Sequence, residues 1–381
     1  MSKIKVVKEK KSKRSKRGQS NVKSKTRKLP KFAITAVAAV VVAAVALIWA
    51  LPNLPLRPSA QPPSGYKGVI ELWNVESFEG GSGSRSSWLT GRSAKFEAKH
   101  SGLFVHVTTL TDAELKQKIA DGQTFDIICF SRGSGDAVKE MLAPIDADTS
   151  AVRDNMLLAG QIGGKQYAVP LYAGAYCLFA RQSQLVQDDL LSKALTQTYT
   201  RKIGKNTIEL SPMVCGFTPY NSPLTALAMS GGKGNASAIA ENVTQYQAYE
   251  KFVSNKSSVT LLGTQRDLFR LNQREENGKI EELGFYPLAG YTDLVQFVGV
   301  SSSCGEKFSA CEEYISYLLS AEAQQTLVNL SLFSVLDTAL YTDKRYSALE
   351  TGLAQAFVPN AFVDAEIIAG QRQTAKSTLA M

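Results

Sequence analysis

Alternating hydrophobic and polar positions open the main part of the chain. Residues 69–75 (VIELWNV) and 103–109 (LFVHVTT) alternate with a period of two, which predicts β-strands. Residues 125–131 (FDIICFS) are almost continuously apolar, as expected of a strand covered on both faces of a parallel sheet. Apolar positions in residues 86–99 and 112–120 recur at helical spacing. The order strand, helix, strand, helix, strand indicates a doubly wound α/β sheet.

The pattern continues to the carboxyl end. Residues 167–180 (YAVPLYAGAYCLFA) predict a long β-rich stretch, and residues 309–329 predict a helix with Leu318 and Leu327 on its apolar face. A further helix is expected from about residue 347, and Pro359 should interrupt it because proline has no N–H to donate. Residues 66–381 are enough for two lobes.

A second pattern precedes this region. Residues 32–51 (FAITAVAAVVVAAVALIWAL) carry no charge, and twenty residues of helix span about 30 Å, the thickness of a hydrocarbon core. We expect an uncleaved transmembrane anchor. The alternative is a signal peptide cleaved near Ser59-Ala60, but the apolar run is longer than is usual for such peptides. Residues 52–65 hold five prolines and predict a stiff linker.

Charge is distributed unevenly along the chain. Residues 1–31 hold fourteen Lys and Arg and one acid, Glu9, whereas the remaining 350 residues hold 29 basic and 33 acidic side chains. Nucleic-acid binding by the main region therefore has no electrostatic support. A basic tail before an apolar span predicts a single-pass protein of the cell membrane, with a cytoplasmic N-terminus and an extracellular carboxyl-terminal domain. Anionic lipids are expected near the tail.

The residues that carry most enzyme chemistry are scarce. The sequence has two histidines, His100 and His106, and contains no G-x-S-x-G, Walker A or H-E-x-x-H motif. We expect no catalytic residue, no metal site and no cofactor. Of the five cysteines, Cys129 and Cys177 stand in apolar runs and are predicted to be buried. Two others, Cys304 and Cys311, could pair across a short loop.

Polar and aromatic residues follow two of the predicted strands. The first strand ends at Trp73, Asn74 and Glu76, and the third ends at Ser131 and Arg132. Ligands of open α/β sheets bind beyond the carboxyl ends of the strands. Aromatic faces with amide, hydroxyl and charged groups suit a polyhydroxylated ligand. Alternatively, these Gly- and Ser-rich loops only turn the chain.

Five segments carry a family resemblance. The chain from about residue 66 to 340 resembles the extracellular solute-binding proteins of ABC-type importers, in the large family rich in carbohydrate binders. Ala289 stands where that family usually has a second proline, and Ser331 and Ser334 replace a usual Gly and Pro. No cysteine for lipid attachment follows the apolar run. The segments are ELWNVESFEGGSG, FDIICFSRG, GGKQYAVPLYAGAYCLFARQSQL, FYPLAGYTDLVQFVGVSSSC and EEYISYLLSAEAQQTLVNLSLFSV.

The resemblance implies an α/β, two-lobed periplasmic-binding-protein-like fold with doubly wound sheets and a central cleft, here preceded by one transmembrane helix. Residues 66–381 would form the extracellular domain, with crossings between lobes near residues 169–172 and 295–299. Ligand-binding candidates are Trp73, Asn74, Glu76, Ser131, Arg132, Tyr172, Tyr176, Tyr220 and Tyr291.

The implied function is capture of a sugar or related solute outside the cell. Because the chain has one apolar span and no P-loop, the permease subunits and the ATPase would be separate proteins. Two other classes stay open. The chain could be an anchored sensor or envelope adaptor that keeps the fold without transport, or an envelope enzyme with two facing carboxylates.

Overall fold

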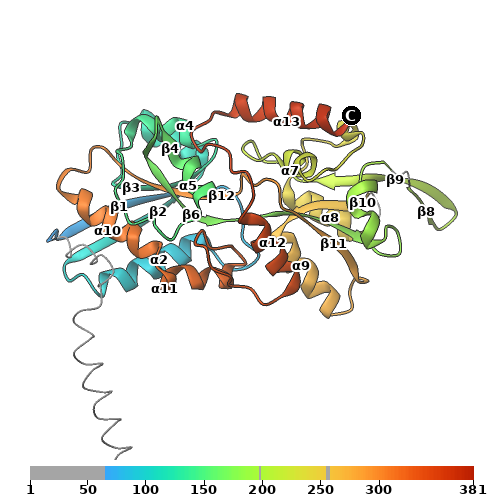
Figure 1. The fold of residues 1–381 in the computed structure, drawn as a ribbon, viewed down its shortest axis with the longest axis horizontal. Helices are drawn as coiled ribbons and strands as arrows, with labels where there is room; N and C mark the ends of the chain where they lie inside the picture. Colours follow the sequence, from blue (N-terminus) through green and yellow to red (C-terminus); the bar gives the residue numbers. More distant parts are fainter. Residues whose placement is uncertain (1–64, 197–198, 255–257) are drawn as a thin grey trace, which may run out of the picture. The chain divides into compact units, whose positions relative to one another are not determined.

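The computed structural model describes residues 65–196, 199–254 and 258–381. These described residues form one compact unit, which contains two five-stranded sheets (Figure 1). The predicted basic tail, the apolar span and all but the last residue of the predicted linker lie outside the described residues. Within the described ranges, no helix combines the length and the hydrophobicity needed to cross a bilayer.

The first sheet has the strand order β2-β1-β3-β12-β6 and forms the first lobe. Strand β1 pairs in parallel with β2 and with β3, so all three present their carboxyl ends at the same edge. Strand β12 runs antiparallel to β3 and to β6. The bounds are β1 Gly68–Val75, β2 Leu103–Leu110, β3 Ile127–Ser131, β6 Ala168–Ala173 and β12 Val295–Val300.

The second sheet has the order β11-β7-β10-β9-β8 and forms the second lobe. Strand β10 is parallel to β9 and antiparallel to β7, and β7 pairs antiparallel with β11. The bounds are β7 Tyr176–Arg181, β8 Tyr199–Ile203, β9 Asn206–Cys215, β10 Ser258–Thr264 and β11 Leu283–Leu288; a two-stranded ribbon, β4 Gln161–Ile162 and β5 Lys165–Gln166, lies apart from both sheets.

Helices α2 and α10 lie side by side on one face of the first sheet (Figure 1). Their contact is aromatic, with the rings of Phe96 and Tyr314 5.1 Å apart in an edge-to-face arrangement. Helix α3 begins with a capping box, in which the Thr111 hydroxyl accepts from the Glu114 N–H and the Glu114 carboxylate accepts from the Thr111 N–H. First-lobe helices are α2 Arg85–Glu97, α3 Asp112–Ala120, α4 Gly135–Val138, η2 Lys139–Met141, α5 Asp154–Leu157, η3 Leu158–Gly160, η6 Gly305–Lys307, α10 Phe308–Leu318, α11 Ala321–Gln324 and η7 Gln325–Leu330.

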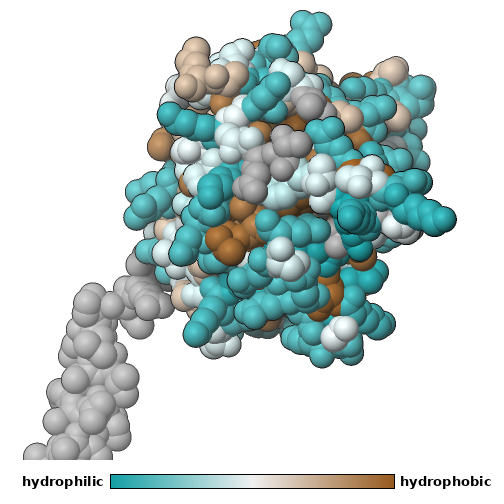
Figure 2. All heavy atoms as spheres, turned by 90° about the vertical axis from the view of Figure 1, so that its right-hand side faces the viewer, coloured by the Kyte–Doolittle hydropathy of each residue, from teal (hydrophilic) through white to brown (hydrophobic). Residues whose placement is uncertain are grey.

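The second lobe carries the remaining helices. Helix α8 packs on β10, α12 packs on β11, and α13 packs along α7. Seen from the end of this lobe, the surface is mostly hydrophilic, with hydrophobic atoms confined to small areas (Figure 2). The bounds are η4 Gln187–Asp189, α6 Leu190–Lys193, α7 Pro223–Met229, η5 Ala236–Ala238, α8 Gln245–Ser254, α9 Gln265–Glu276, α12 Lys344–Leu353 and α13 Ala365–Leu379.

The strands predicted from alternation are confirmed as β1 and β2, and the strand predicted from the apolar run is confirmed as β3. Pro359 does separate two helices, α12 and α13. The prediction of one helix over 309–329 is wrong. Ser320 caps a new helix by accepting from the Ala323 N–H at 3.3 Å. The buried Gln324 amide then donates to the Leu318 carbonyl at the end of α10. Ser331, at a position where the resemblance implies Gly, adopts φ 53°, a left-handed conformation that glycine adopts most readily.

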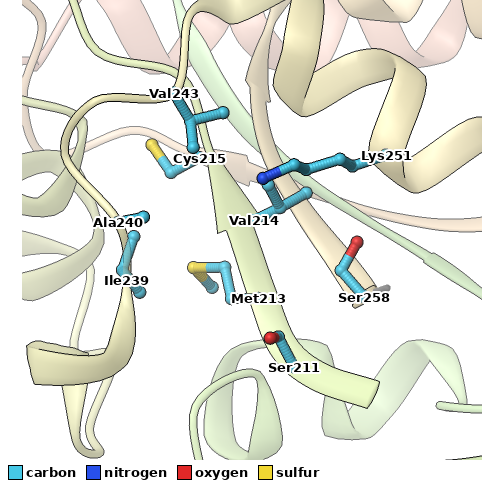
Figure 3. A pocket seen from close by; sticks show the side chains of 9 residues that line it. All are labelled: Ser211, Met213, Val214, Cys215, Ile239, Ala240, Val243, Lys251 and Ser258. Carbon is cyan, nitrogen blue, oxygen red and sulfur yellow. The ribbon is translucent and has the colours of Figure 1, made fainter. Parts of the chain in front are cut away.

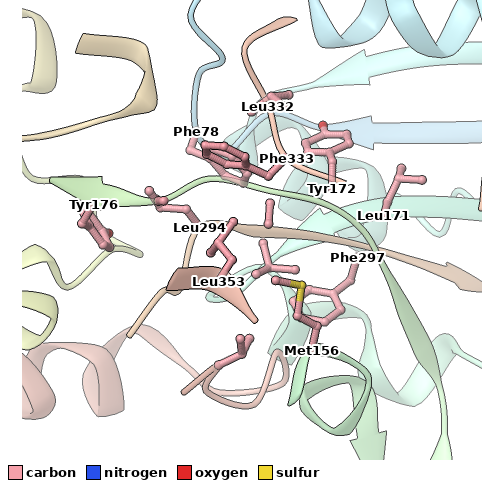
Figure 4. Close-up of a cluster of buried hydrophobic side chains, with 14 of the residues drawn as sticks. Phe78, Met156, Leu171, Tyr172, Tyr176, Leu294, Phe297, Leu332, Phe333 and Leu353 are labelled. Atoms are coloured by element: carbon pink, nitrogen blue, oxygen red, sulfur yellow. The ribbon is translucent and has the colours of Figure 1, made fainter. Parts of the chain in front are cut away.

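The chain passes from the first sheet to the second at Gly174 and Ala175, between β6 and β7, and returns between β11 and β12. The segments predicted as crossings between the lobes, 169–172 and 295–299, therefore lie within strands β6 and β12 of the first sheet, next to these passages. Hydrophobic side chains fill the region around both passages (Figure 4). Phe78 and Tyr172 meet there with ring centroids 6.0 Å apart.

Candidate functional site

Asp293 lies at the centre of a buried polar network between the two sheets. It belongs to the segment that returns to β12, and its side chain is fully buried. The Tyr176 hydroxyl donates to Oδ1 at 2.6 Å, and the Tyr291 hydroxyl donates to Oδ2 at 3.0 Å. The backbone N–H of Ser222, just before α7, donates to Oδ2 at 2.7 Å. Asp293 thus joins β7, α7 and the returning segment.

Arg132 reaches this network from the first lobe, directly after β3. Its Nη1 lies 3.5 Å from Oδ2 of Asp293 and donates to the Tyr291 hydroxyl at 3.1 Å. Its Nη2 donates to Oε1 of Gln371 on α13. Burial raises the pKa of Asp293, and the Arg132 charge and the hydrogen bonds oppose this rise. Burial also raises the pKa of Tyr176 and Tyr291, so both hydroxyls stay protonated as donors.

A pocket of about 500 Å³ adjoins this network. Its volume is in the range of small-molecule sites. Tyr291 and Phe357 form one wall as stacked rings 6.3 Å apart, held by a hydrogen bond from the Thr292 N–H to the Phe357 carbonyl. Gln371, which accepts from Arg132, belongs to both network and pocket. The lining residues are Thr225, Ala228, Met229, Tyr291, Phe357, Gln371, Thr374, Ala375 and Thr378.

Helix α13 supplies four of these residues, at positions 371, 374, 375 and 378. The spacing i, i+3, i+4, i+7 places them on one face, and the same side of the helix packs along α7. Arg372, the residue after Gln371, donates a hydrogen bond to the Asn221 carbonyl at 2.7 Å and so holds α13 against the second lobe. None of the nine lining residues carries a charge at neutral pH, so the pocket suits an uncharged ligand.

Four buried polar atoms near the network have no hydrogen-bond partner among the described residues. They are Nε of Arg132, Nδ2 of Asn221, Oγ of Ser222 and Oγ1 of Thr225. Buried polar groups are almost always paired with protein, water or ligand. Of these residues, Thr225 also lines the pocket beside Tyr291.

A second contact between the lobes lies near Gly133, the residue after Arg132. The Tyr220 hydroxyl donates to Oδ2 of Asp112, the first residue of α3, at 2.5 Å. Its ring lies so close to Gly133 that a Cβ there would stand 2.1 Å from a ring carbon. Asp112 also pairs with Lys116 at 2.8 Å.

The structure brings together four of the nine predicted ligand-binding residues. Arg132, Tyr176 and Tyr291 meet at Asp293, and Tyr220 lies against the residue after Arg132. Ser131 is buried at the end of β3, and its hydroxyl lies 3.5 Å from the Arg132 carbonyl.

The other four predicted residues lie elsewhere. Trp73 packs in the first lobe against Phe125, with ring centroids 5.2 Å apart, and Tyr172 packs against Phe78 and Trp88. Asn74 is buried beside them on β1. Glu76 is about half exposed and pairs with Arg85 at 3.7 Å. No described contact joins Glu76 to Arg132, although both are predicted ligand-binding residues.

Sequence reasoning missed Asp293, Gln371 and Phe357. An acid within the apolar run LAGYTDLVQFVGV was the available signal for Asp293, because an acidic side chain in such a run needs a partner. No pattern in the sequence indicated Gln371 or Phe357 as site residues, because only the path of the C-terminal segment brings them to Tyr291.

Other candidate sites are less suited to a ligand. A cavity of about 80 Å³ lies between β9 and residues 239–243 in the second lobe (Figure 3). It is below the size of small-molecule sites. His100 stacks on Phe96 and lies 2.8 Å from Glu313, and His106 lies 2.8 Å from Glu71, both in the first lobe. Among the described residues, no group of His, Cys, Asp and Glu is arranged to hold a metal ion.

Comparison with known proteins establishes the fold. No protein-family model matches the chain, and no curated protein matches it by sequence. Solved structures do match. The GacH receptor of Streptomyces glaucescens, solved with acarbose, is 16% identical with a TM-score of 0.55; the match covers 82% of this chain and 93% of the receptor.

Two other structures show how widely the fold is shared. The sugar-binding protein MalE of Xanthomonas citri is 13% identical with a TM-score of 0.56, covering 82% of this chain and 92% of that one. The iron-bound HitA of Pseudomonas aeruginosa is 13% identical with a TM-score of 0.51, covering 82% and 99%. The chain has the two-lobed α/β fold of these solute-binding proteins. The iron protein shows that the fold alone does not select a sugar.

Proposed function

We propose that this chain is a membrane-anchored extracellular solute-binding protein that captures a sugar or a related neutral solute for an ABC-type importer. The observation that carries the proposal is the uncharged pocket of about 500 Å³ with the Tyr291 and Phe357 rings on one wall and threonine and glutamine side chains on the others. Aromatic faces contact the C–H surface of a sugar ring, while hydroxyl and amide groups bond its hydroxyls.

Charge within the site supports a neutral ligand over an ionic one. The Arg132 guanidinium is already paired with Asp293, so neither side chain offers a net charge to a solute. Several structural neighbours are described with sugars, including acarbose and mannotriose. Residues 32–51 would hold the protein in the membrane, and separate permease and ATPase subunits would complete the importer.

A second candidate function is a sensor or envelope adaptor without transport. The contacts between the lobes favour it, because they join the lobes through this chain's own residues. Besides Arg132–Asp293 and Tyr220–Asp112, Glu79 pairs with Arg266, and the Glu79 carbonyl accepts from the Gln265 amide at 3.0 Å. In this alternative, a ligand or partner would act by separating these pairs.

The test is a thermal-shift and calorimetric screen of the full-length protein in detergent. The probes are maltose, maltotriose, mannobiose, a neutral amino acid and a polyamine. A ligand at a hundred times its Kd should stabilise the protein by about 2.7 kcal/mol. Thr374→Trp should abolish binding, because Thr374 lines the pocket and is exposed, so the larger side chain fills the pocket without disturbing the core.

The matched control is Gln373→Trp, an exposed neighbour on α13 that does not line the pocket. It should bind as the unaltered protein does. Binding of a sugar that both variants retain would place the ligand outside this pocket. Stabilisation by no sugar, with a cleanly folded protein, would leave the sensor or adaptor function as the better account.

A further inference from the structure

Two large apolar side chains stand half exposed at the pocket of about 500 Å³. Met229, the last residue of α7, is 50% exposed, and Phe357 is 57% exposed. Single exposed apolar side chains are common on protein surfaces, but two that line the same pocket form an apolar patch at its opening. The patch is a candidate contact for an apolar part of the ligand.

The backbone of Gly290 holds both side chains beside Tyr291. The Phe357 N–H donates to the Gly290 carbonyl at 3.0 Å, and the Phe357 ring stacks on Tyr291. Met229 lies so close to Gly290 that a Cβ there would stand 3.3 Å from the Met229 Cβ and 2.9 Å from its carbonyl oxygen. Met229, Tyr291 and Phe357 therefore form one apolar wall of the pocket.

Helix α13 has already used the hydroxyl hydrogens that it presents to the pocket. The Thr374 hydroxyl donates to the Gly370 carbonyl at 3.1 Å, and the Thr378 hydroxyl donates to the Thr374 carbonyl at 3.0 Å. The Tyr291 hydroxyl likewise donates to Asp293. These oxygens have lone pairs with which to accept from a ligand, but their hydrogens are engaged.

Two side-chain donors of the pocket lining stay available among the described residues. Oγ1 of Thr225 is buried and has no partner. The Gln371 amide engages Arg132 through its oxygen only, so its NH₂ group has no described hydrogen bond. A buried sugar hydroxyl left unpaired costs free energy. Since a sugar carries many more hydroxyls than these groups satisfy, a sugar by itself is a poor match for the whole pocket.

We propose that the pocket binds a glycoside with an uncharged aromatic or alkyl aglycone, which packs on the apolar wall while the sugar bonds to Thr225 and Gln371. This inference rests on the proposed function and names the class of solute. The sugar lies at the buried end, where the Thr225 hydroxyl lacks a partner. The aglycone lies at the opening, because covering Met229 and Phe357 removes apolar surface from water. The flexible methionine adapts to aglycones of different shapes.

The test is isothermal titration calorimetry of the full-length protein in phosphatidylcholine nanodiscs, because glycoside detergents would compete for the pocket. The probes are methyl and phenyl α-D-glucopyranoside, the same pair of α-D-mannopyranosides, maltose and phenol. For at least one sugar, the phenyl glycoside should bind at least about tenfold more tightly than the methyl glycoside, because its ring is buried on the apolar wall. Phenol alone should bind more weakly than that phenyl glycoside.

Variants separate the two ends of the pocket. Met229→Ala and Phe357→Ala should each reduce the preference for the phenyl glycoside to about threefold or less, because each removes part of the apolar wall. Thr225→Val should weaken the phenyl and methyl glycosides by similar factors and so retain the preference. Tyr246→Ala is the control, since Tyr246 on α8 is 59% exposed but does not line this pocket, and it should change neither affinity.

The measurements on the unaltered protein stand without any variant. Equal affinity for the phenyl and methyl glycosides of every sugar that binds would overturn this inference and leave the proposed function intact. A preference that Met229→Ala and Phe357→Ala both retain would also overturn it, because the aglycone would then lie elsewhere. Phenol that binds as tightly as the phenyl glycosides, without binding of maltose, would overturn both this inference and the proposed function, and so would a lack of binding by every probe.

Discussion

The guanidinium of Arg132 lies 3.5 Å from the carboxylate of Asp293, and both side chains are almost wholly buried. The pair joins the end of β3 to the segment that leads back into β12. A buried charge that loses its partner costs far more than the pair itself contributes, because the remaining charge stays away from water. Breaking this pair should therefore be costly to the folded protein.

The first prediction concerns this pair. Arg132→Met and Asp293→Asn should each destabilise the protein by about 3–5 kcal/mol, because each leaves a buried charge unpaired. The double variant should lose clearly less than the sum. Urea unfolding of all four proteins measures this coupling. Strictly additive losses would mean that the two groups do not interact.

The second prediction concerns Gly133, which has φ +93° beneath the Tyr220 ring. Gly133→Ala should cost the strain of a left-handed alanine, about 1–2 kcal/mol, and in addition should displace Tyr220 from Asp112. Gly163→Ala is the control, since Gly163 is also left-handed, at φ +57°, but has open space around it. Chemical denaturation should show the larger loss at Gly133.

Tyr220→Ala removes the obstructing ring, so the double variant Gly133→Ala, Tyr220→Ala should lose less than the two single losses added together. Equal costs at Gly133 and Gly163 would indicate that the ring does not lie over Gly133 in solution.

The third prediction is a pH dependence at Asp112. Burial acts to raise the pKa of this carboxyl, but hydrogen bonds from Lys116 and Tyr220 outweigh it and hold the pKa below its usual value of 3.8. The unfolded chain therefore takes up this proton at a higher pH than the folded protein does. The resulting stability is fully present above about pH 5 and is lost as the pH falls through 3.8 and below.

Denaturant titrations between pH 3 and 6 test this. Asp112→Asn should flatten the acid end of the stability profile relative to the unaltered protein. Asp121→Asn, an exposed acid at the end of the same helix, should leave the profile unchanged. Identical profiles for the unaltered protein and Asp112→Asn would contradict the assignment.

The fourth prediction concerns topology. Residues 32–51 and the basic residues before them predict a protein that stays with the membrane after a high-salt wash, because salt screens lipid–lysine attraction but leaves an apolar helix in place. A protease added to intact cells should digest the region after residue 65 and spare the tail. Recovery of a soluble form beginning near Gln61 as the major product would instead indicate a cleaved signal peptide.

The sequence by itself determined several strands and helices and the α/β class of the fold. Alternation in VIELWNV and the unbroken apolar run IICF specify β1 and β3, because side-chain period and burial follow directly from residue type. Thr111 with Glu114 fixes the start of α3 through local hydrogen bonds. The convergence of Arg132 with Tyr291 was also foreseeable in outline, since both stand beside strand ends that face the junction of the lobes.

Only the tertiary structure decided which side chains make the site. Trp73 and Arg132 both end strands, yet Trp73 packs against Phe125 whereas Arg132 leaves its lobe to reach Asp293. Phe357 and Gln371 reach Tyr291 through the path of the C-terminal segment. Before α13, the Ala361 N–H donates to the Ala159 carbonyl and holds this segment on the first lobe. Helix α13 then packs on α7 in the second lobe. Local pattern specifies an element and its buried face, but contacts between residues about fifty to two hundred and forty positions apart depend on how whole elements pack. These contacts can be identified only from the three-dimensional packing of the elements.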